Sequence, residues 1–256
     1  MNTESWSGGP NSLHGKLALV TGGTRGIGFS IAEMLAKHGT QVVICGKSEE
    51  SVKTALSRFD TLAPSKVNGK AADVKHHEEV QALFEFVDRT LGGLDILVNN
   101  AGIGRFGAVS QISPQDWADV LGTNLTGTFY CTQEALARFA PRRGGYVVNV
   151  SSLAGKNPFA GGAAYNASKF GVNGFSEAVM LDSRYENVRV TTVMPGSVAT
   201  EFGMTRPKDG KDWPDAGRDW KIWPQDVADV VRAVLEMPAR TTVSAIEIRP
   251  SQPKRK

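Results

Sequence analysis

A tyrosine and a lysine four residues apart, Tyr165 and Lys169, are the residues of this sequence best suited to moving a proton. The surrounding segment predicts a helix from about Ala163, and residues four apart on a helix share one face. A phenol titrates at about 10, and a fixed positive charge beside it lowers that pKa toward the range useful for acid–base catalysis. Ser152, thirteen residues before Tyr165, adds a hydroxyl that could hold a carbonyl oxygen. Together these side chains predict a proton-transfer site that interconverts a carbonyl and an alcohol.

The glycine-rich segment 21–28 (TGGTRGIG) decides whether the Tyr–Lys pair is more than a solvated pair on a helix surface. It follows an apolar run at 16–21 and precedes a helical pattern that ends at Gly39. A strand, a glycine-rich turn and a helix in this order let backbone amides and the helix dipole approach a pyrophosphate. The segment therefore predicts a dinucleotide site, against the alternative of a plain turn. Its candidate residues are Gly22, Thr24, Arg25, Gly26, Ile27 and Gly28.

The end of the second predicted strand, 41–45, indicates which nicotinamide cofactor fits. Folds that bind NAD usually carry an acid there, which bonds the ribose 2′-hydroxyl, whereas this sequence continues with Gly46, Lys47 and Ser48. An acid would repel a 2′-phosphate of about −1.5 to −2 charges, while Lys47 and Arg25 supply cations. NADP(H) is therefore predicted to be preferred over NAD(H), the alternative being that Lys47 is an ordinary surface lysine. The adenine contacts predicted at the end of the third strand are Asp73 and Val74.

Apolar runs and amphipathic helical patterns alternate along the chain. Strands are predicted at 16–21, 41–45, 67–72, 94–98, 145–150, 188–193 and 245–249, with helices between them. This alternation, with right-handed crossovers, predicts an α/β, single-domain Rossmann fold: a doubly wound, seven-stranded parallel sheet with helices on both faces. The predicted domain covers 13–250, after a disordered leader (1–12) and before a basic tail (251–256). Within it, the irregular segment 201–223 is predicted to be a substrate lid.

The composition limits which classes of partner and which cellular compartment are expected. The 256 residues carry 29 basic and 26 acidic side chains, a net charge of +3, which gives no reason to expect nucleic acid or a membrane surface as partner. Two cysteines in predicted element interiors, Cys45 and Cys131, favour a reducing, cytoplasmic setting. No apolar run approaches the ~20 residues that span a bilayer, and the amino terminus lacks a signal-peptide pattern. His76 and His77 are adjacent at a helix start without a carboxylate or cysteine cluster, so no metal is predicted.

These motifs occur in the order found in the classical short-chain dehydrogenases/reductases, which the chain resembles over about 13–249. TGGTRGIG is similar to that family's cofactor loop, NNAG (99–102) to its sheet-stabilising motif, and PGSVAT (195–200) to its nicotinamide-contacting turn. Ser152, Tyr165 and Lys169 occupy the catalytic positions, and NLTG (124–127) resembles the segment that contributes Asn124 as a fourth catalytic residue. The resemblance also implies cofactor contacts at Asn100, Ala101, Gly102, Tyr165, Lys169, Pro195, Gly196, Val198 and Thr200.

The resemblance implies an oxidoreductase acting on CH–OH donors, in which hydride passes between a nicotinamide and a carbonyl carbon. Tyr165 would donate the proton, and Lys169 would lower the tyrosine pKa and bond the nicotinamide ribose. Ser152 would polarise the carbonyl, and Asn124 would hold a water that links Lys169 to solvent. A homotetramer or homodimer is implied as well, with a small carbonyl or alcohol as substrate.

Two alternatives stay open. Family members that reduce 3-oxoacyl chains on carrier protein usually end in Asp-Gly-Gly, whereas 244–252 (SAIEIRPSQ) lacks that ending. This puts a 3-oxoacyl-carrier-protein reductase in doubt without excluding it. The other alternative is a non-catalytic Rossmann module that senses NADPH or binds a partner. The intact Ser152, Tyr165 and Lys169 argue against it.

Three segments that leave the carboxyl ends of predicted strands supply candidates for the substrate site. Because most of these residues are aromatic, they predict a mostly apolar pocket that closes over an aliphatic or aromatic ketone or aldehyde. Alternatively, any one tryptophan of 201–223 simply packs that segment onto the core. The candidates are Arg105, Phe106, Phe159, Phe202 and Trp213.

Overall fold

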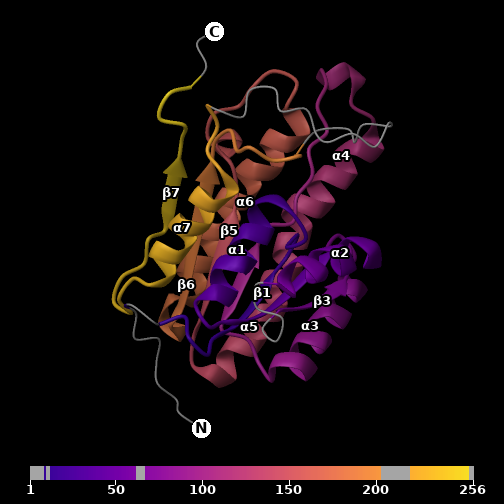
Figure 1. Ribbon diagram of the computed structural model, residues 1–256. Helices are drawn as coiled ribbons and strands as arrows, with labels where there is room; N and C mark the ends of the chain where they lie inside the picture. The colour runs from indigo at the N-terminus through magenta and orange to yellow at the C-terminus, as the bar shows by residue number, and fades with distance from the viewer. Residues whose placement is uncertain (1–8, 10–11, 62–66, 203–219, 254–256) are drawn as a thin grey trace.

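A seven-stranded parallel sheet organises the protein, with strand order β3-β2-β1-β4-β5-β6-β7 (Figure 1). The computed structural model describes residues 9, 12–61, 67–202 and 220–253. The strands are β1 (Leu17–Val20), β2 (Gln41–Gly46), β3 (Val67–Ala71), β4 (Ile96–Asn99), β5 (Gly145–Val150), β6 (Val188–Pro195) and β7 (Ala245–Ile248). Every adjacent pair is parallel, so the predicted Rossmann fold is confirmed. The strand order reverses between β1 and β4, which places a topological switch point there.

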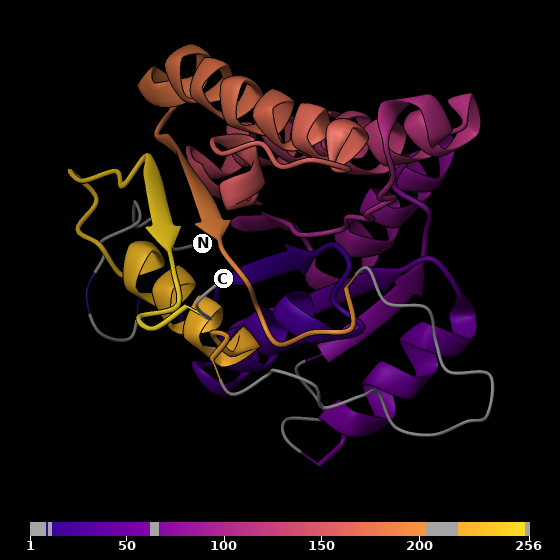
Figure 2. The same ribbon diagram turned by 90° about the horizontal axis from the view of Figure 1, so that it is seen from above.

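Helices cover both faces of the sheet. They are α1 (Gly26–Lys37), α2 (Glu49–Phe59), α3 (His77–Leu91), α4 (Pro114–Leu121), α5 (Gly127–Phe139), α6 (Ala163–Ser183) and α7 (Pro224–Leu235). Buried side chains of α1, α2 and α7 share one core with the sheet, and those of α3, α5 and α6 share the other. Figure 2, seen from above, shows α6 (orange) and α7 (yellow) on opposite sides of the strands. Because helices cover both faces, β5 and β6 are buried throughout and read as apolar runs.

Two strand boundaries differ from the sequence prediction by two residues, and the others differ by at most one. β4 begins at Ile96 rather than at residue 94, because the Asp95 carboxylate accepts a hydrogen bond from the Leu17 backbone N–H at 2.9 Å. β6 continues to Pro195, beyond the predicted end at 193, because it pairs with β7 as far as Pro195 and Ile248.

A turn of π-helix, Gly122–Thr126, joins α4 to α5. Two glycines and Asn124 are unfavourable inside a regular helix, and this turn accommodates them. α4 has Pro114 at its first position, and the Ser113 hydroxyl accepts the Asp116 N–H at 3.0 Å. Single π-helical turns often occur at functional sites, and this one carries the buried side chain of Asn124.

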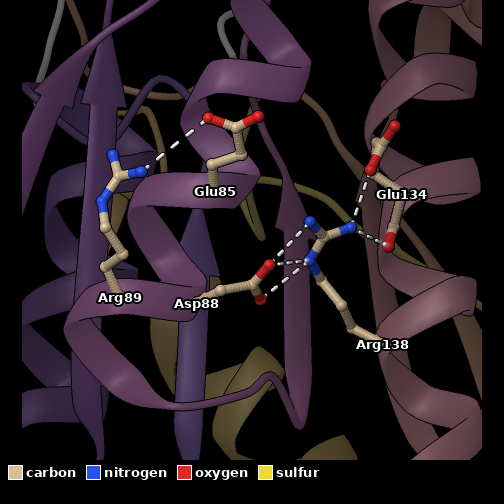
Figure 3. A network of polar contacts seen from close by, with 5 residues as sticks. All are labelled: Glu85, Asp88, Arg89, Glu134 and Arg138. Carbon is tan, nitrogen blue, oxygen red and sulfur yellow. Dashed lines mark hydrogen bonds and ion pairs between the residues drawn. The ribbon is translucent and has the colours of Figure 1, made fainter.

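An ion-pair network connects α5 to α3 (Figure 3). The Arg138 guanidinium on α5 donates to both carboxylate oxygens of Asp88 on α3 at 2.8–3.1 Å, and to Glu134 at 2.7 Å. It also lies 5.0 Å from the centre of the Phe84 ring. A bidentate, partly buried arginine pair of this kind holds its geometry better than an isolated surface pair. The network therefore fixes α5, which starts directly after the turn that holds Asn124.

The limits of the domain stay a prediction. The predicted lid is described only at 201–202 and 220–223, so Trp213 lies outside the described residues, as do most of the predicted leader and the last three residues of the tail. Leu13, at the predicted start of the domain, is completely buried in the core. None of the helices in the described part of the chain is long and apolar enough to cross a bilayer. Among the same residues, no group of three potential ligands is arranged to hold a metal ion.

Candidate active site

A cavity of about 790 Å³ opens where the chain leaves the carboxyl ends of β1, β4, β5 and β6. Its volume falls within the range of ~300–1,000 Å³ that is usual for ligand pockets. The sequence-predicted residues on its wall are Gly22, Thr24, Arg25, Gly26, Ile27, Lys47, Asp73, Val74, Asn100, Ala101, Gly102, Arg105, Ser152, Tyr165, Lys169, Pro195, Gly196, Val198, Thr200 and Phe202. The described predicted site residues that do not line it are Gly28, Ser48, Phe106, Asn124 and Phe159.

The amino end of α1 and the glycine-rich loop form a cradle for an anion. The first turn of α1 contains no acid, so its amides and the helix dipole are available to a phosphate. Gly28 lies behind this surface, since a Cβ there would come within 2.3 Å of the Gly22 carbonyl oxygen. The Asn100 amide donates to the Thr21 and Gly22 carbonyls at 3.1 and 3.0 Å and so holds the loop in shape. This cradle fits the pyrophosphate of a dinucleotide.

A side chain at the end of β2 would crowd the neighbouring loop. A Cβ on Gly46 would lie 2.5 Å from the Thr24 Cγ2, so Thr24 would have to shift to make room for an acid there. The Lys47 ammonium lies 2.9 Å from Asp73, and the Arg25 guanidinium lies 3.2 Å from Glu201. Burial alone would raise the pKa of Asp73, but the hydrogen bond from Lys47 and the other nearby cationic and backbone groups lower it below its ordinary value. Both cations predicted for a 2′-phosphate are thus paired with carboxylates in this structure.

Ser48, the candidate cofactor contact that follows Lys47, caps a helix. It is the N-cap residue of α2, and its hydroxyl accepts a hydrogen bond from the Ser51 N–H at 3.3 Å. Its contact with the cofactor stays a prediction.

Tyr165, in the first turn of α6, meets Ser152 at the end of β5. The Ser152 hydroxyl lies near enough to the Tyr165 phenol to lower its pKa, and the Ser152 oxygen accepts the Ala154 N–H at 3.1 Å. The Lys169 ammonium donates to the Val150 carbonyl at 2.8 Å and lies 5.8 Å from the centre of the Tyr165 ring. The structure therefore brings together the three side chains whose types and spacing indicated proton transfer.

The predicted pKa shift of Tyr165 is wrong in direction for this structure. Burial raises the pKa of the Tyr165 phenol above its usual value, and the hydrogen bond with Ser152 offsets only part of that rise. Burial also lowers the pKa of Lys169 to about 8. Because the ammonium is directed at the Val150 carbonyl and is itself desolvated, its attraction for a phenolate does not outweigh burial. Tyr165 is consequently held in its protonated form at neutral pH.

Hydrogen bonds of the Asn124 side chain connect the segment after β4 to α6. Its oxygen accepts the Ile103 N–H at 2.8 Å, and its nitrogen donates to the Ile103 carbonyl at 3.0 Å and to the Ser168 hydroxyl at 2.9 Å. Ser168 in turn donates to the Tyr165 carbonyl at 2.8 Å. These contacts give Asn124 a positioning part in the site. The predicted water that links Lys169 to solvent stays a prediction.

Two phenylalanine rings predicted for the substrate site pack against the Tyr165 ring. Phe202 lies 5.4 Å from it and Phe106 lies 5.8 Å from it, edge-on at 71°, while Phe159 packs 5.9 Å from Phe106. Phe202 and Arg105 line the cavity, whereas Phe106 and Phe159 do not, and Arg105 lies 3.2 Å from Asp116. The structure thus gathers the described aromatic candidates beside Tyr165, and their contact with substrate stays a prediction.

Several charged residues on the cavity wall were missed by sequence reasoning. They come from elements distant in the chain and carry no motif, so no local signal marked them. Lys75 and Asp119, for example, form an ion pair of 2.9 Å between the start of α3 and α4. The missed residues are Arg58, Lys75, Asp119, Glu201 and Lys221.

Comparisons with known proteins agree with this geometry. A family model described as short chain dehydrogenase matches residues 16–211. The chain belongs to the short-chain dehydrogenase/reductase family. It is 39% identical to the 3-oxoacyl-[acyl-carrier-protein] reductase FabG of Aquifex aeolicus (strain VF5), over 74% of this chain and 77% of that one. It is 34% identical to the 3alpha-hydroxysteroid dehydrogenase of Mediterraneibacter gnavus, over 77% of this chain and 79% of the relative.

Solved structures show the same fold. A metagenomic short-chain oxidoreductase in complex with NADP has a TM-score of 0.80 and 31% identity, and the match covers 94% of this chain and 99% of that one. An alcohol dehydrogenase from the archaeon Thermococcus sibiricus, with a TM-score of 0.84 but 23% identity over 94% of this chain and 99% of that one, supports the fold alone. As a member of this short-chain dehydrogenase family, the protein is an oxidoreductase that acts on CH–OH or carbonyl groups. The alternative of a non-catalytic module is therefore set aside.

Proposed function

We propose that this short-chain dehydrogenase interconverts a ketone or aldehyde and the corresponding alcohol with NADP(H), using Tyr165 as general acid and base. The observation that carries the proposal is that Ser152, Tyr165 and Lys169 lie together on the wall of the cavity that also holds the phosphate cradle. NADP(H), when bound, would supply or accept the hydride. The other parts of the reaction fall to residues of this chain.

The hydroxyl groups of Ser152 and Tyr165 lie on the same cavity wall and can both face one substrate oxygen. Ser152 would donate a hydrogen bond to the carbonyl oxygen, and Tyr165, kept protonated by burial, would pass its proton to that oxygen as negative charge develops. The nearby Lys169 ammonium would stabilise the resulting phenolate. The amino end of α1 would hold the pyrophosphate, and Lys47 with Arg25 would hold the 2′-phosphate.

The proposed cofactor preference gives a measurable ratio. We expect kcat/KM with NADPH to exceed that with NADH at least tenfold, because charge-assisted contacts contribute ~1.5–3 kcal/mol each. Lys47 would exchange Asp73 for the phosphate at little cost, since its side chain is 76% exposed and such pairs are weak. In Lys47→Ala the ratio should fall several-fold, mainly through the NADPH value. Equal efficiency with both cofactors in the wild-type enzyme would contradict the preference.

The aromatic residues around Tyr165 support an apolar substrate. We expect kcat/KM to rise with chain length across a series of aliphatic ketones, and to be higher still for aryl ketones. Phe106→Ala should lower kcat/KM for the bulky ketones by roughly 5- to 30-fold, because an aromatic contact is worth ~1–2 kcal/mol, with little change for the smallest aldehydes. Tyr185→Ala, at a residue 85% exposed after α6, is the control. A preference for small charged substrates would contradict this reading.

A second candidate function is the reduction of 3-oxoacyl thioesters. It is favoured by the relatives named 3-oxoacyl-[acyl-carrier-protein] reductase, one of them 39% identical. Including 3-oxoacyl thioesters in the same substrate series separates the two candidates. If the kcat/KM for a thioester exceeds that of every simple ketone tenfold, the second function replaces the first.

The proposal includes a cytoplasmic homodimer or homotetramer. Large exposed rings on α4, α5 and α6 support self-association, because contiguous exposed apolar surface is uncommon in monomers. They are Trp117, Phe129 and Phe170. The buried free thiols of Cys45 and Cys131 support a reducing compartment.

A further inference from the structure

Helix α2 carries an arginine, Arg58, whose side chain lines the cofactor cavity although nothing in the sequence marked it. Its guanidinium lies 3.7 Å from the centre of the Phe29 ring in the first turn of α1. Phe29 is itself buried and stacks on Phe59 with 4.3 Å between ring centres. A guanidinium stacked on a ring fixed in this way gains cation–π attraction and is held in one orientation.

The two nearby cations each have an acidic partner in the structure. Arg25 is paired with Glu201, and Lys47 is paired with Asp73. Among the ion pairs of residues 9, 12–61, 67–202 and 220–253, none joins a carboxylate to the Arg58 guanidinium. An arginine has N–H donors along its planar edge, and stacking on Phe29 uses only its face. Arg58 can thus bind an anion without first leaving an acidic partner.

The position of Arg58 indicates which anion this is. Phe29 follows Arg25 by one helical turn, so the stacked guanidinium lies beside the amino end of α1. Thr24, Gly46 and Lys47, on the same cavity wall, surround the end of β2. That strand end is where Rossmann folds distinguish a ribose 2′-hydroxyl from a 2′-phosphate.

We propose that Arg58 is a specificity-determining residue that binds the 2′-phosphate of NADP(H), as a third cation beside Arg25 and Lys47. This rests on the proposed NADP(H) function and deepens it. A phosphate of about −1.5 to −2 charges accepts two parallel N–H bonds from an arginine edge. A lysine at position 58 would keep the charge but lose the stacking and the bidentate geometry.

The test measures binding to the full chain by calorimetry, with NADPH, NADH, 2′,5′-ADP and 5′-ADP as ligands. In Arg58→Gln we expect the Kd for NADPH and for 2′,5′-ADP to rise five- to tenfold, while those for NADH and 5′-ADP change less than twofold. Arg58→Lys should fall between Arg58→Gln and the wild type. Lys53→Gln, at an exposed position of the same helix outside the cavity wall, is the matched control and should change none of the four.

The outcomes separate this inference from the proposed function. If the wild type prefers NADPH at least tenfold and Arg58→Gln keeps that preference, the assignment of Arg58 is wrong and the cofactor proposal stands. If Arg58→Gln weakens all four ligands equally, the residue supports the site only structurally and the assignment is again overturned. If the wild type binds NADH as tightly as NADPH, the cofactor preference fails first, and the assignment fails with it.

Discussion

Replacing Tyr165 with phenylalanine is expected to lower kcat by roughly 10²–10⁴-fold, the usual contribution of a general acid, with little change in NADPH affinity. The substitution removes a hydroxyl whose pKa is raised by burial, so that it stays protonated until the substrate oxygen becomes negative. The ring itself stays, and with it the contacts to Phe106 and Phe202. Single-turnover rates and cofactor titration separate the loss of chemistry from a loss of binding.

Tyr146→Phe is the matched control for this prediction. Tyr146 is a fully buried tyrosine outside the cavity wall, whose hydroxyl bonds Thr191 at 2.7 Å. Losing that bond should lower the free energy of unfolding by about 0.5–1.5 kcal/mol and leave kcat within about twofold. A Tyr165→Phe enzyme that retains more than half of the wild-type kcat would refute the role of the phenol as proton donor.

Gly28→Ala is expected to lower the free energy of unfolding by about 1–3 kcal/mol, as overpacking typically does, and to weaken NADPH binding. A methyl group there would come within 2.3 Å of the Gly22 carbonyl oxygen and 2.4 Å of the Asn100 amide nitrogen. Either α1 or the glycine-rich loop must then move, and the loop is held by that same amide. Urea unfolding and a cofactor titration measure the two effects.

Gly174→Ala on α6 is expected to change the stability in the opposite direction. A methyl group at Gly174 meets nothing within 4 Å. The change should raise the free energy of unfolding by about 0.4–1 kcal/mol, because alanine lowers the conformational entropy of the unfolded chain. Opposite signs at two helical glycines would show that space, and not helix propensity, decides the result. A stable Gly28→Ala protein with unchanged cofactor affinity contradicts the close approach that we describe.

Local sequence already contained the fold and the chemistry. Most strands are short apolar runs separated by amphipathic helices, and a parallel sheet covered on both faces favours that pattern. The glycine-rich loop is likewise one contiguous segment, and Tyr165 and Lys169 are one helical turn apart. Features fixed by neighbouring residues could therefore be predicted without knowledge of the rest of the chain.

Burial, in contrast, depends on the whole arrangement. The spacing of Tyr165 and Lys169 predicted a lowered tyrosine pKa, but burial raises the pKa of Tyr165 and lowers that of Lys169 to about 8. No single segment determines how far a side chain is removed from water. The Asn124 side chain shows the same limit, because its partners Ile103 and Ser168 come from two other segments.

The sequence by itself determined the seven-stranded parallel fold and pointed to the proposed proton donor, because both follow from local periodicity and spacing. Tertiary structure alone decided which acids pair with Lys47 and Arg25, and that Arg58 reaches the cofactor wall. Arg58 lies on α2 and Phe29 lies on α1, and the packing of these two helices brings the two side chains into contact. Their contact, like every charge pairing across the cavity, is set by the packing of segments far apart in the chain, where sequence spacing carries no information.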